Sequence, residues 1–526
     1  MHPSLAHLQP QLSVVGAGVA VVDFDNDGRP DVFLHSSARG AESRLFRNNG
    51  DGTFSDAAPA AGLADINQET GAMRALFFDF DNDGWKDLVL TTFGCPRVLR
   101  NRKGRFTDVT ASSRLECGQA PASNALDFDE DGFLDLVIGY RRTRPVDLQD
   151  PDRYDIMNIT PGLAHIDPGR IVVYRNRGGK GFYPIPGNLG ISNRRGFTHA
   201  IGVYDLRGTG RRDLYIAMDM APDKVFFNEG DGRFLDGSAA LRQEASLNGM
   251  SAEIADIDDD GRPAVFVTNI HEPERSMNGG NLLWKAFSDG SFRESARLRG
   301  VGRCGYAWGA KFLDLDNDGD LELAVSNGMI SGDPSRDYWP SMEALSRRPA
   351  AFQLDARNWP PYAGASLFGR EQKCLFIKEG ARFRDRAEEA GMADRLDGRG
   401  LAAIDIAGDG KLSLLSANQA QPVRLYLNET RSAGRWMGFS LEGGRSNRDA
   451  WGTRVSVRLK GGRTLSRELE PANGYAAQSD ARLHFGLGRD PEIESVEVRW
   501  PGGEKQELRG FLADRYHPLR EPPPKR

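Results

Sequence analysis

Acidic residues recur at alternate positions in residues 79–87, whose sequence DFDNDGWKD places aspartates at relative positions 1, 3, 5 and 9 and a glycine at position 6. Calcium takes six to eight oxygen ligands, and a tight turn that aims alternate side chains inward can supply them. The glycine permits a sharp backbone turn after the third acid. Without a cation, each pair of carboxylates 4 Å apart would repel by about 4 kcal/mol at an effective dielectric near 20. The spacing therefore predicts a calcium loop rather than an ordinary acidic surface turn.

The same pattern recurs along the chain and is complete in four loops. In each of these, the carboxylates and the backbone carbonyl at position 7 are the expected ligands of a Ca²⁺ ion. The predicted ligands are Asp23, Asp25, Asp27, Arg29 and Asp31 in the first loop; Asp79, Asp81, Asp83, Trp85 and Asp87 in the second; Asp127, Asp129, Asp131, Phe133 and Asp135 in the third; and Asp314, Asp316, Asp318, Asp320 and Glu322 in the sixth.

Three further copies of the loop are incomplete. In the fourth, residues 205–213, Arg207 replaces the second acid, and its fixed charge could stand in for the ion. The fifth keeps the acids at positions 1, 3 and 5 but has lost the last one, and the seventh, residues 405–413, has lost the second. We expect the fifth loop to bind calcium weakly and the fourth and seventh to hold none. The acids of the fifth loop are Asp256, Asp258 and Asp260.

Short apolar runs flank the loops in a regular way. One run precedes a loop, as in Ala75–Phe78, and another follows it, as in Asp87–Leu90. Their length and their β-branched and aromatic residues are typical of strands, and two more short runs complete most repeats. Four strands per repeat, with seven repeats of about 50 to 90 residues, predict an all-β fold, a seven-bladed β-propeller over residues 1–431. A solenoid is the alternative, but its repeats are shorter.

Residues 432–526 contain no acidic loop but do contain apolar runs of strand length, such as Arg454–Leu459 and Glu494–Arg499. They predict a small C-terminal β domain. Two segments interrupt the repeats, residues 141–169 and residues 329–373. Long insertions in a regular scaffold are either functional loops or plain surface elaborations.

The chain has 526 residues and a formal net charge of −6. The acidity is concentrated in the loops, which argues against nucleic acid as a partner. Residues 1–11 have neither a basic segment nor a long apolar core, so the sequence predicts no secretory signal and no membrane span. This favours a cytoplasmic protein, or a secreted one whose leader has been removed.

The chain has four cysteines, Cys95, Cys117, Cys304 and Cys374. None of them forms a C-x-x-C pair, which argues against a zinc site. Cys95 and Cys117 could form a disulfide, or all four could be buried free thiols.

The repeats resemble the FG-GAP/VCBS family, whose calcium-loop propeller repeats also occur in integrin α-subunits. Residues 248–252 (NGMSA) and 307–312 (AWGAKF) are similar to bacterial relatives of cartilage acidic protein. Residues 446–449, 474–479, 483–488 and 496–503 look like an ASPIC/UnbV domain, although Ala450 and Trp451 stand where that domain is expected to have small or aliphatic residues. The resemblance implies a propeller stabilised by several structural Ca²⁺ ions.

A ligand pocket is expected on the face opposite the loops. Each loop lies at one end of an innermost strand, so the residues just before that strand lie at the other end, near the central channel. The expected pocket residues are Arg74, Asn124, Arg303, Tyr306 and Trp308, with His199 as the acid–base group if there is catalysis. The insertion carries Tyr338, Trp339, Trp359 and Tyr362 and could cover this mouth. The alternative is ordinary packing at strand ends.

Three functions agree with these features. The UnbV resemblance implies an intracellular role in natural product biosynthesis of the enediyne type, with an apolar metabolite bound or transformed without a redox cofactor. Cyclisation, addition or rearrangement would be the reaction classes. The alternatives are a non-catalytic module that binds protein or carbohydrate, as in integrin-like propellers, and a purely structural calcium protein. Fold alone does not choose among them.

Overall fold

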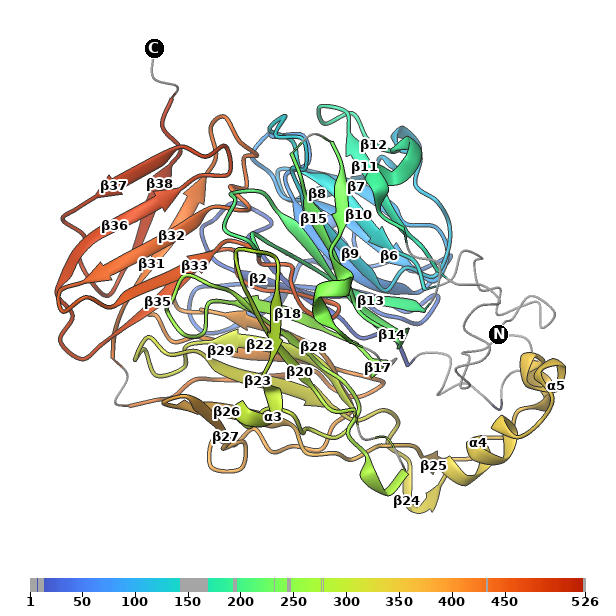
Figure 1. Ribbon diagram of the computed structural model, residues 1–526. Helices are drawn as coiled ribbons and strands as arrows, with labels where there is room; N and C mark the ends of the chain where they lie inside the picture. Colours follow the sequence, from blue (N-terminus) through green and yellow to red (C-terminus); the bar gives the residue numbers. More distant parts are fainter. Residues whose placement is uncertain are drawn as a thin grey trace.

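The computed structural model describes residues 7, 14–141, 169–192, 196–230, 232–243, 247–275, 277, 279–431 and 434–523. Most of the first insertion and the predicted domain boundary at residue 432 lie outside the described residues. Strands make up most of the regular secondary structure of the described residues (Figure 1).

Seven antiparallel sheets follow one another along residues 19–426 of the described chain. Each begins with an inner strand that runs directly into one of the acidic loops. In chain order the strands are β1 (Val19–Val22), β2 (Asp31–Leu34), β3 (Arg44–Asn48) and β4 (Phe54–Asp56); β5 (Ala72–Phe78), β6 (Asp87–Thr92), β7 (Arg97–Arg102) and β8 (Arg105–Asp108); β9 (Ala122–Leu126), β10 (Asp135–Gly139), β11 (Ile171–Asn176) and β12 (Phe182–Pro184); β13 (Phe197–Tyr204), β14 (Asp213–Ala221), β15 (Lys224–Asn228), β16 (Phe234–Asp236) and β17 (Leu247–Asn248); β18 (Ala252–Ala255), β19 (Ala264–Val267), β20 (Leu282–Ala286) and β21 (Phe292–Glu294); β22 (Ala307–Leu313), β23 (Glu322–Asn327), β26 (Cys374–Glu379) and β27 (Arg382–Asp385); and β28 (Gly398–Ile404), β29 (Ser413–Asn418) and β30 (Arg424–Tyr426).

The inner strands form a closed ring. Each contacts the inner strand of the next sheet, from β1 through β5, β9, β13, β18 and β22 to β28, and β28 contacts β1. Apolar side chains fill the spaces between neighbouring sheets; Phe33, Phe77 and Leu88, for example, lie in one cluster between the first two. Because both faces of a blade are covered, its strands are apolar on both faces. The arrangement is that of a β-propeller, and the predicted all-β propeller fold is confirmed.

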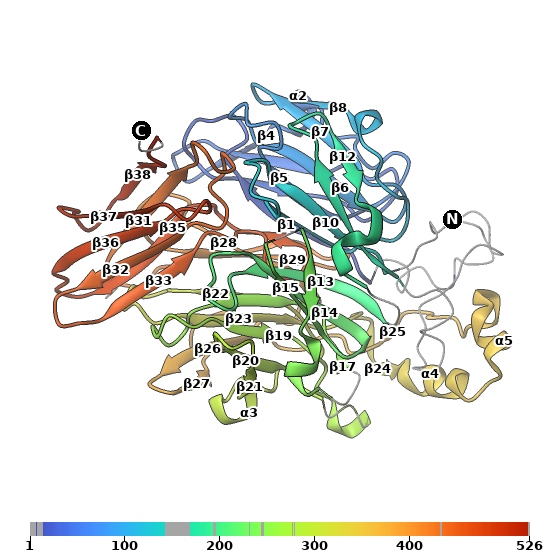
Figure 2. The same ribbon diagram turned by 45° about the horizontal axis from the view of Figure 1, so that its top comes forward.

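The C-terminal region adds two sheets on one side of the ring (Figures 1 and 2). Its core is continuous with the second and third blades, because Trp451 packs against Phe78 with ring centroids 6.0 Å apart. The strands are β31 (Arg435–Glu442), β35 (Leu483–Gly488) and β38 (Tyr516–Arg520) in one sheet and β32 (Arg454–Leu459), β33 (Thr464–Glu468), β36 (Ile493–Arg499) and β37 (Lys505–Leu508) in the other.

One C-terminal strand leaves these sheets and enters the ring. β34 (Ala477–Gln478) pairs in parallel with β1, with Ala477 opposite Val19 and Gln478 opposite Ala20. It contacts β28 and β5 as well. The sequence predicted that all of residues 432–526 form a separate unit, whereas this short strand belongs to the first propeller sheet.

The second insertion forms the largest helical part of the described chain. It contains β24 (Asp333–Asp337) and β25 (Ala365–Ser366), and its helices lie at the end of the molecule opposite the C-terminal sheets (Figures 1 and 2). The helices are α4 (Trp339–Ser346), α5 (Ala350–Leu354) and the 3-10 turn η7 (Ala356–Asn358); elsewhere are α2 (Ala58–Ala61), α3 (Ala296–Arg299), η2 (Thr110–Ser112), η4 (Pro186–Gly190), η5 (Ser238–Leu241) and η6 (Pro273–Arg275).

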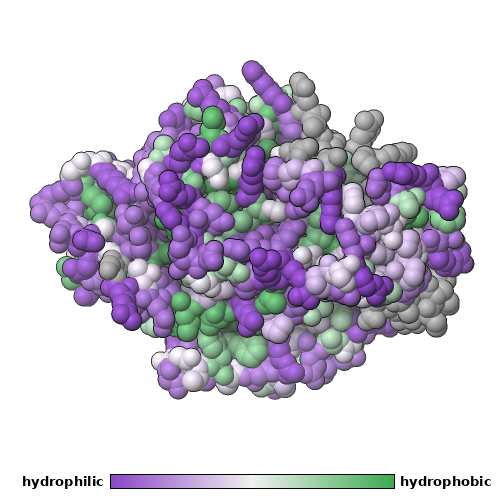
Figure 3. Space-filling view, turned by 90° about the horizontal axis from the view of Figure 1, so that it is seen from below, coloured by the Kyte–Doolittle hydropathy of each residue, from purple (hydrophilic) through white to green (hydrophobic). Residues whose placement is uncertain are grey.

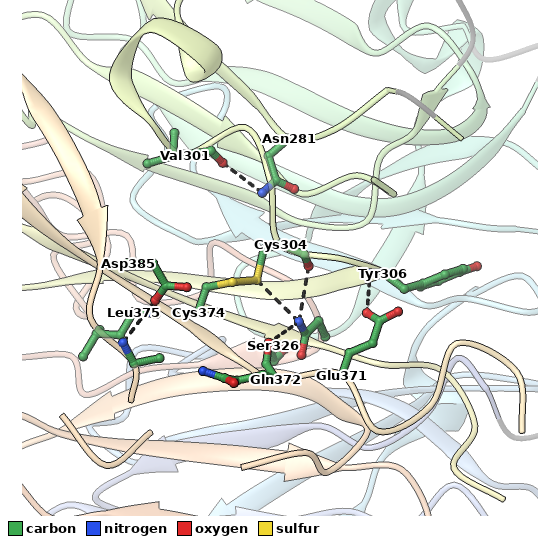
Figure 4. Close-up of a disulfide and its surroundings, with 12 residues drawn as sticks. Asn281, Val301, Cys304, Tyr306, Ser326, Glu371, Gln372, Cys374, Leu375 and Asp385 are labelled. Atoms are coloured by element: carbon green, nitrogen blue, oxygen red, sulfur yellow. Dashed lines mark hydrogen bonds between the residues drawn. A yellow bond between two sulfur atoms is a disulfide. The ribbon is translucent and has the colours of Figure 1, made fainter. Parts of the chain in front are cut away.

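Two disulfides join all four cysteines, Cys95 with Cys117 and Cys304 with Cys374. The second fastens the end of the insertion, where β26 begins, to the segment that precedes β22 (Figure 4). Asn327 reinforces this junction, because its side-chain amide donates to the Cys304 carbonyl at 3.3 Å. The alternative of free thiols is therefore wrong for this structure.

No helix among the described residues is long and apolar enough to cross a membrane. Seen from below, the surface is mostly hydrophilic, with a few apolar patches between the polar side chains (Figure 3).

Candidate metal centres

All seven acidic loops share one backbone conformation. In every loop the first acid accepts a hydrogen bond from the N–H at position 6, and in all but the sixth it also accepts the N–H at position 5, as Asp79 does from Gly84 at 2.7 Å and from Asp83 at 3.0 Å. In the sixth loop the N–H of Asp318, at position 5, donates to Asp316 at 3.3 Å instead. Position 4 is left-handed, as at Asn82, and Gly84 has a φ of 94°. A side chain is strained at such an angle, so the glycine is required by the turn itself. This conformation brings the acidic side chains to one side of the loop.

An asparagine on the third strand of most sheets locks the loop to its neighbour. The acid at position 9 accepts from the backbone N–H of this asparagine, as Asp87 does from Asn101 at 2.7 Å. The Asn101 side chain then donates to the carbonyl of Phe24, in the preceding loop, at 2.8 Å. Five asparagines make this contact between blades: Asn48, Asn101, Asn176, Asn228 and Asn428.

Four loops bring at least three acidic oxygens together. In each of them, one oxygen from every member lies within 4.8 Å of the others. These are the four loops that the sequence predicts to be complete, and no other such group occurs among the described residues. The groups are Asp23, Asp25 and Asp27; Asp79, Asp81 and Asp87; Asp127, Asp129 and Asp131; and Asp314, Asp316 and Glu322.

The remaining predicted ligands lie in the same loops but are not part of these groups. The carboxylates of Asp31 and Asp135 accept backbone N–H groups of the loop and of the asparagine. Asp83 and Asp318 accept the N–H at position 7, which belongs to Trp85 and Asp320. Ligation by the carbonyls of Arg29, Trp85, Phe133 and Asp320 remains a prediction.

Each complete loop contains a buried carboxylate oxygen that has no hydrogen-bond partner among the described residues. In the first three loops this unpartnered oxygen is Oδ1 of the acid at position 3, namely Asp25, Asp81 or Asp129. In the sixth loop it is Oδ1 of Asp314, the first acid. Oδ2 of Asp81 is instead paired with Arg100 at 2.9 Å, and Oδ2 of Asp129 with Arg175 at 2.7 Å. One oxygen of each aspartate is thus held by arginine while the other is left for a ligand. Hard oxygen donors of this kind fit calcium.

The carboxylates are buried without enough positive charge to balance them. Burial is the main cause, and neighbouring acids add to it, of a pKa raised to about 7 for Asp79, Asp127 and Asp314 and to about 9 for Asp87. Burial disfavours the charged form of an acid unless an opposite charge lies close by. A divalent cation in the loop would supply that charge.

The three incomplete loops satisfy their acids differently. In the fourth, Arg207 lies 3.4 Å from Asp213 and 3.0 Å from Glu229, so a guanidinium takes the position expected for an ion. In the fifth, Lys285 lies 3.3 Å from Asp258 and 2.7 Å from Asp260. In the seventh, the hydroxyl of Tyr516 donates to Asp405 at 2.8 Å. Side chains of the protein thus contact the acids of these loops, although Oδ2 of Asp213 in the fourth loop is buried without a hydrogen-bond partner among the described residues.

The C-terminal domain rests directly on the loop face of the propeller. Oδ2 of Asp449 accepts the N–H of Asp79 at 2.7 Å, and Asp449 forms an ion pair with Lys86 of the same loop. At the sixth loop, the N–H of Gly486 donates to Asp314 at 3.1 Å. The first acids of two complete loops are therefore shared between the candidate metal sites and the domain contact.

The hairpin between β32 and β33 reaches the fifth and sixth loops. Its Arg463 lies 2.9 Å from Asp259 and 2.7 Å from Asp320, and it donates to the Asp318 carbonyl at 2.9 Å. In the described part of the chain, no hydrogen bond or ion pair joins the first loop to the C-terminal domain, so the domain contacts the loops unequally.

A C-terminal segment, residues 472–479, fills the central channel. Arg74 donates to the carbonyls of Ala472, Gly474 and Ala477, and Asn124 donates to the side chain of Asn473 at 3.1 Å. The segment is bonded to other blades as well, at Phe77, Val203, Ala252 and Ala403. The expectation that Arg74 and Asn124 line an open ligand pocket is therefore wrong, because their polar groups hold this segment.

The other expected pocket residues lie beyond the end of the segment. His199 stacks on Tyr475 with ring centroids 6.2 Å apart, and Trp308 lies 5.3 Å from Tyr475 and 5.7 Å from Tyr306. His199 is buried, and burial lowers its pKa well below its usual range. The lowered pKa argues against the expected acid–base group that titrates near neutrality, although His199 lies 3.7 Å from Asp219. Arg303 is exposed and is not part of this buried cluster.

The second insertion covers this end of the channel, as the sequence predicts. Tyr338, Trp359 and Tyr362 are buried in one apolar cluster with Tyr306 and Trp308. The aromatic side chains thus form a packed core, which agrees with the alternative of ordinary packing at strand ends.

Two cavities lie at the junction of the propeller and the C-terminal domain. They have volumes of about 140 Å³ and about 150 Å³, and Glu470 lines both. The nearest cation is Arg212, 3.4 Å from Glu470. The sequence did not predict this junction, because nothing local in residues 432–526 indicates that they fold onto the acidic loops.

Comparison with known proteins gives the same two-part organisation. A model of the FG-GAP-like repeat matches residues 23–90, 79–138 and 205–267, and the ASPIC and UnbV model matches residues 443–526. The chain is a propeller protein with FG-GAP repeats and a C-terminal ASPIC/UnbV domain. It is homologous to cartilage acidic protein 1: it is 23% identical to the Xenopus tropicalis protein, over 81% of this chain and 70% of that protein, and 22% identical to the Homo sapiens protein, over 81% and 68%.

Solved structures with a similar arrangement of strands are more distant. A lectin from Agrocybe aegerita that recognises non-reducing terminal N-acetylglucosamine is 14% identical, with 78% of this chain and 81% of that chain covered and a TM-score of 0.40. The extracellular domain of a hybrid two-component system from B. thetaiotaomicron is 11% identical, with 81% and 41% covered and a TM-score of 0.40.

Proposed function

We propose that this protein is a non-catalytic interaction module in which calcium stabilises the propeller and the surface on which the C-terminal domain rests. The observation that carries the proposal is the unpartnered buried carboxylate oxygen in each of the four complete loops. Ligands for the ions are the acids of the four groups together with water and backbone carbonyls. The ions would neutralise the buried acids and hold the loops rigid beneath the docked domain.

The alternative, transformation of an apolar metabolite in natural product biosynthesis, receives less support. Arg74 and Asn124 already hold residues 472–479, and His199 is buried with a lowered pKa. A general acid or base must reach its substrate and titrate near the working pH. Homology to cartilage acidic protein 1 agrees with an interaction module as well as it does with a biosynthetic protein.

Metal analysis of the purified protein tests the calcium proposal. We expect about four Ca²⁺ ions per chain after dialysis against low micromolar calcium. Asp81→Asn should bind about three, because the substitution removes one charged ligand from the second loop. The matched control is Asp409→Asn in the seventh loop. This loop has Ala407 instead of an acid at position 3, so the substitution should not change the metal content. Absence of bound divalent ions from the wild-type protein would refute the proposal.

We also propose that the protein works in an oxidising compartment. Two disulfides account for all four cysteines, and such bonds persist outside the reducing cytosol. They favour the secreted alternative over the cytoplasmic one. Mass spectrometry of protein alkylated without reductant, directly after isolation from its native source, should find no modified cysteine. Full modification of the four thiols would favour the cytoplasm.

A further inference from the structure

Among the described strands, the seventh propeller sheet has no outer strand. The other six sheets end in a fourth strand, namely β4, β8, β12, β16, β21 and β27. The seventh ends in β30, which pairs only with β29 among the described strands. A strand at the edge of a sheet presents N–H and C=O groups that can pair with another chain.

The side chains of this edge are unusually apolar for an exposed position. Val423, Leu425 and Leu427 are 37%, 38% and 63% exposed, and they make up three of the seven large apolar side chains that are exposed in the described part of the chain. Because Leu425 pairs with Leu415, this row lies on the same face as the buried cluster between the seventh and first sheets. Phe46 and Phe54 of the first sheet are only partly buried against that cluster.

We propose that β30 pairs antiparallel with β30 of a second copy of this chain, about a two-fold axis at Leu425. In this register Leu425 faces the partner's Leu425, and Val423 faces the partner's Leu427. On the other face of the strand, Arg424 lies opposite the partner's Tyr426, whose ring is held in place by its bond to Asp394. No like charges meet, and an arginine over an aromatic ring is favourable.

The self-complementary sequence selects a second copy as the occupant. A two-fold contact uses the same patch on both subunits, so every residue must tolerate its mirror position. Residues 423–427, VRLYL, satisfy this condition with apolar residues facing apolar ones. Shifting the register by one residue to centre the axis on Arg424 would place two arginines opposite each other, which is unfavourable. The contact of two short edges is small, so we expect a weak dimer that depends on protein concentration.

Cross-linking of single-cysteine variants tests both the contact and its register. All native cysteines of the described chain are bridged, so a new cysteine is the only free thiol there. Leu425→Cys should give a covalent dimer with mild oxidation or a short bis-maleimide, because directly opposite side chains have Cβ atoms about 5 Å apart. Val423→Cys alone should give little dimer, whereas the double variant Val423→Cys, Leu427→Cys should give it efficiently.

Leu298→Cys provides the matched control, since Leu298 is 75% exposed in another blade. It should give at least tenfold less dimer than Leu425→Cys. In sedimentation equilibrium, Leu425→Arg should weaken self-association at least tenfold, while Leu298→Arg leaves it unchanged. The proposal fails if the wild-type chain stays monomeric at all concentrations, if Leu425→Cys dimerises no more than the control, or if Val423→Cys alone is as efficient. The first of these results would leave β30 open for a strand of a different protein.

Discussion

Removal of calcium with a chelator is expected to lower the melting temperature of the protein by roughly 10 °C. An ion that binds only the folded state stabilises it by about 2.7 kcal/mol at a hundredfold excess over its Kd. Four such sites contribute on the order of 11 kcal/mol, and for a chain of 526 residues each kcal/mol corresponds to about 1 °C. The effect has a direct physical cause, because the acids would remain buried without the ion, as the raised pKa of Asp87 indicates.

Differential scanning calorimetry at a fixed pH measures this shift. The chelator loaded with calcium beforehand is the control for its non-specific effects, and added calcium should restore the original melting temperature. Asp81→Asn should remove about a quarter of the shift, while Asp409→Asn should preserve it. A melting temperature that does not respond to the chelator would show that the loops are stable without ions.

The acidic loops were predictable from the sequence because the geometry that matters is local. Acids at alternate positions and a glycine at position 6 specify a turn of nine residues, and the structure gathers acids in the four loops where the pattern is complete. The pattern also indicated that Arg207 could stand in for an ion, because a positive side chain among acids is attracted to them. In the structure it pairs with Asp213. The propeller followed from repetition of the same unit.

The contacts in the central channel could not be predicted from local sequence. Arg74 and Asn124 were expected just before the inner strands and lie within them, in β5 and β9, but the groups that they bind lie about 400 and 350 positions further along the chain. The sequence of residues 474–479 identified a domain type without indicating where that segment would lie. A polar residue beside a channel looks the same in the sequence whether it binds a ligand or another part of its own chain.

The Cys304–Cys374 disulfide and the unfinished seventh sheet were missed for related reasons, whereas a Cys95–Cys117 disulfide was one of the predicted alternatives. Cys304 and Cys374 are 70 positions apart, and only the fold brings them together at the root of the insertion. β30 has the composition of an ordinary strand, and its exposure depends on the absence of a neighbour among the described strands. Both are properties of tertiary arrangement rather than of local sequence.

Replacement of Arg74 by methionine is expected to destabilise the protein by about 3 to 5 kcal/mol and to loosen the channel segment. Arg74 is fully buried, and although burial lowers its pKa to about 10, it remains charged at neutral pH. It donates to three carbonyls of the C-terminal region, at Ala472, Gly474 and Ala477. Methionine preserves much of the volume but leaves these carbonyls buried without a donor, at a cost of about 1 to 3 kcal/mol each.

Two measurements distinguish this role from simple packing. Denaturant unfolding gives the loss of stability of Arg74→Met. In the same variant, hydrogen exchange should be faster at residues 472–478 than elsewhere in the C-terminal domain. Arg509→Met is the matched control, because Arg509 is exposed and its ion pair within the described residues is with the exposed Glu507, so its change should stay within about 0.5 kcal/mol. If Arg74→Met were as stable as this control and exchange in the segment were unchanged, Arg74 would not hold the segment, and its side chain would again be available for a ligand in the channel.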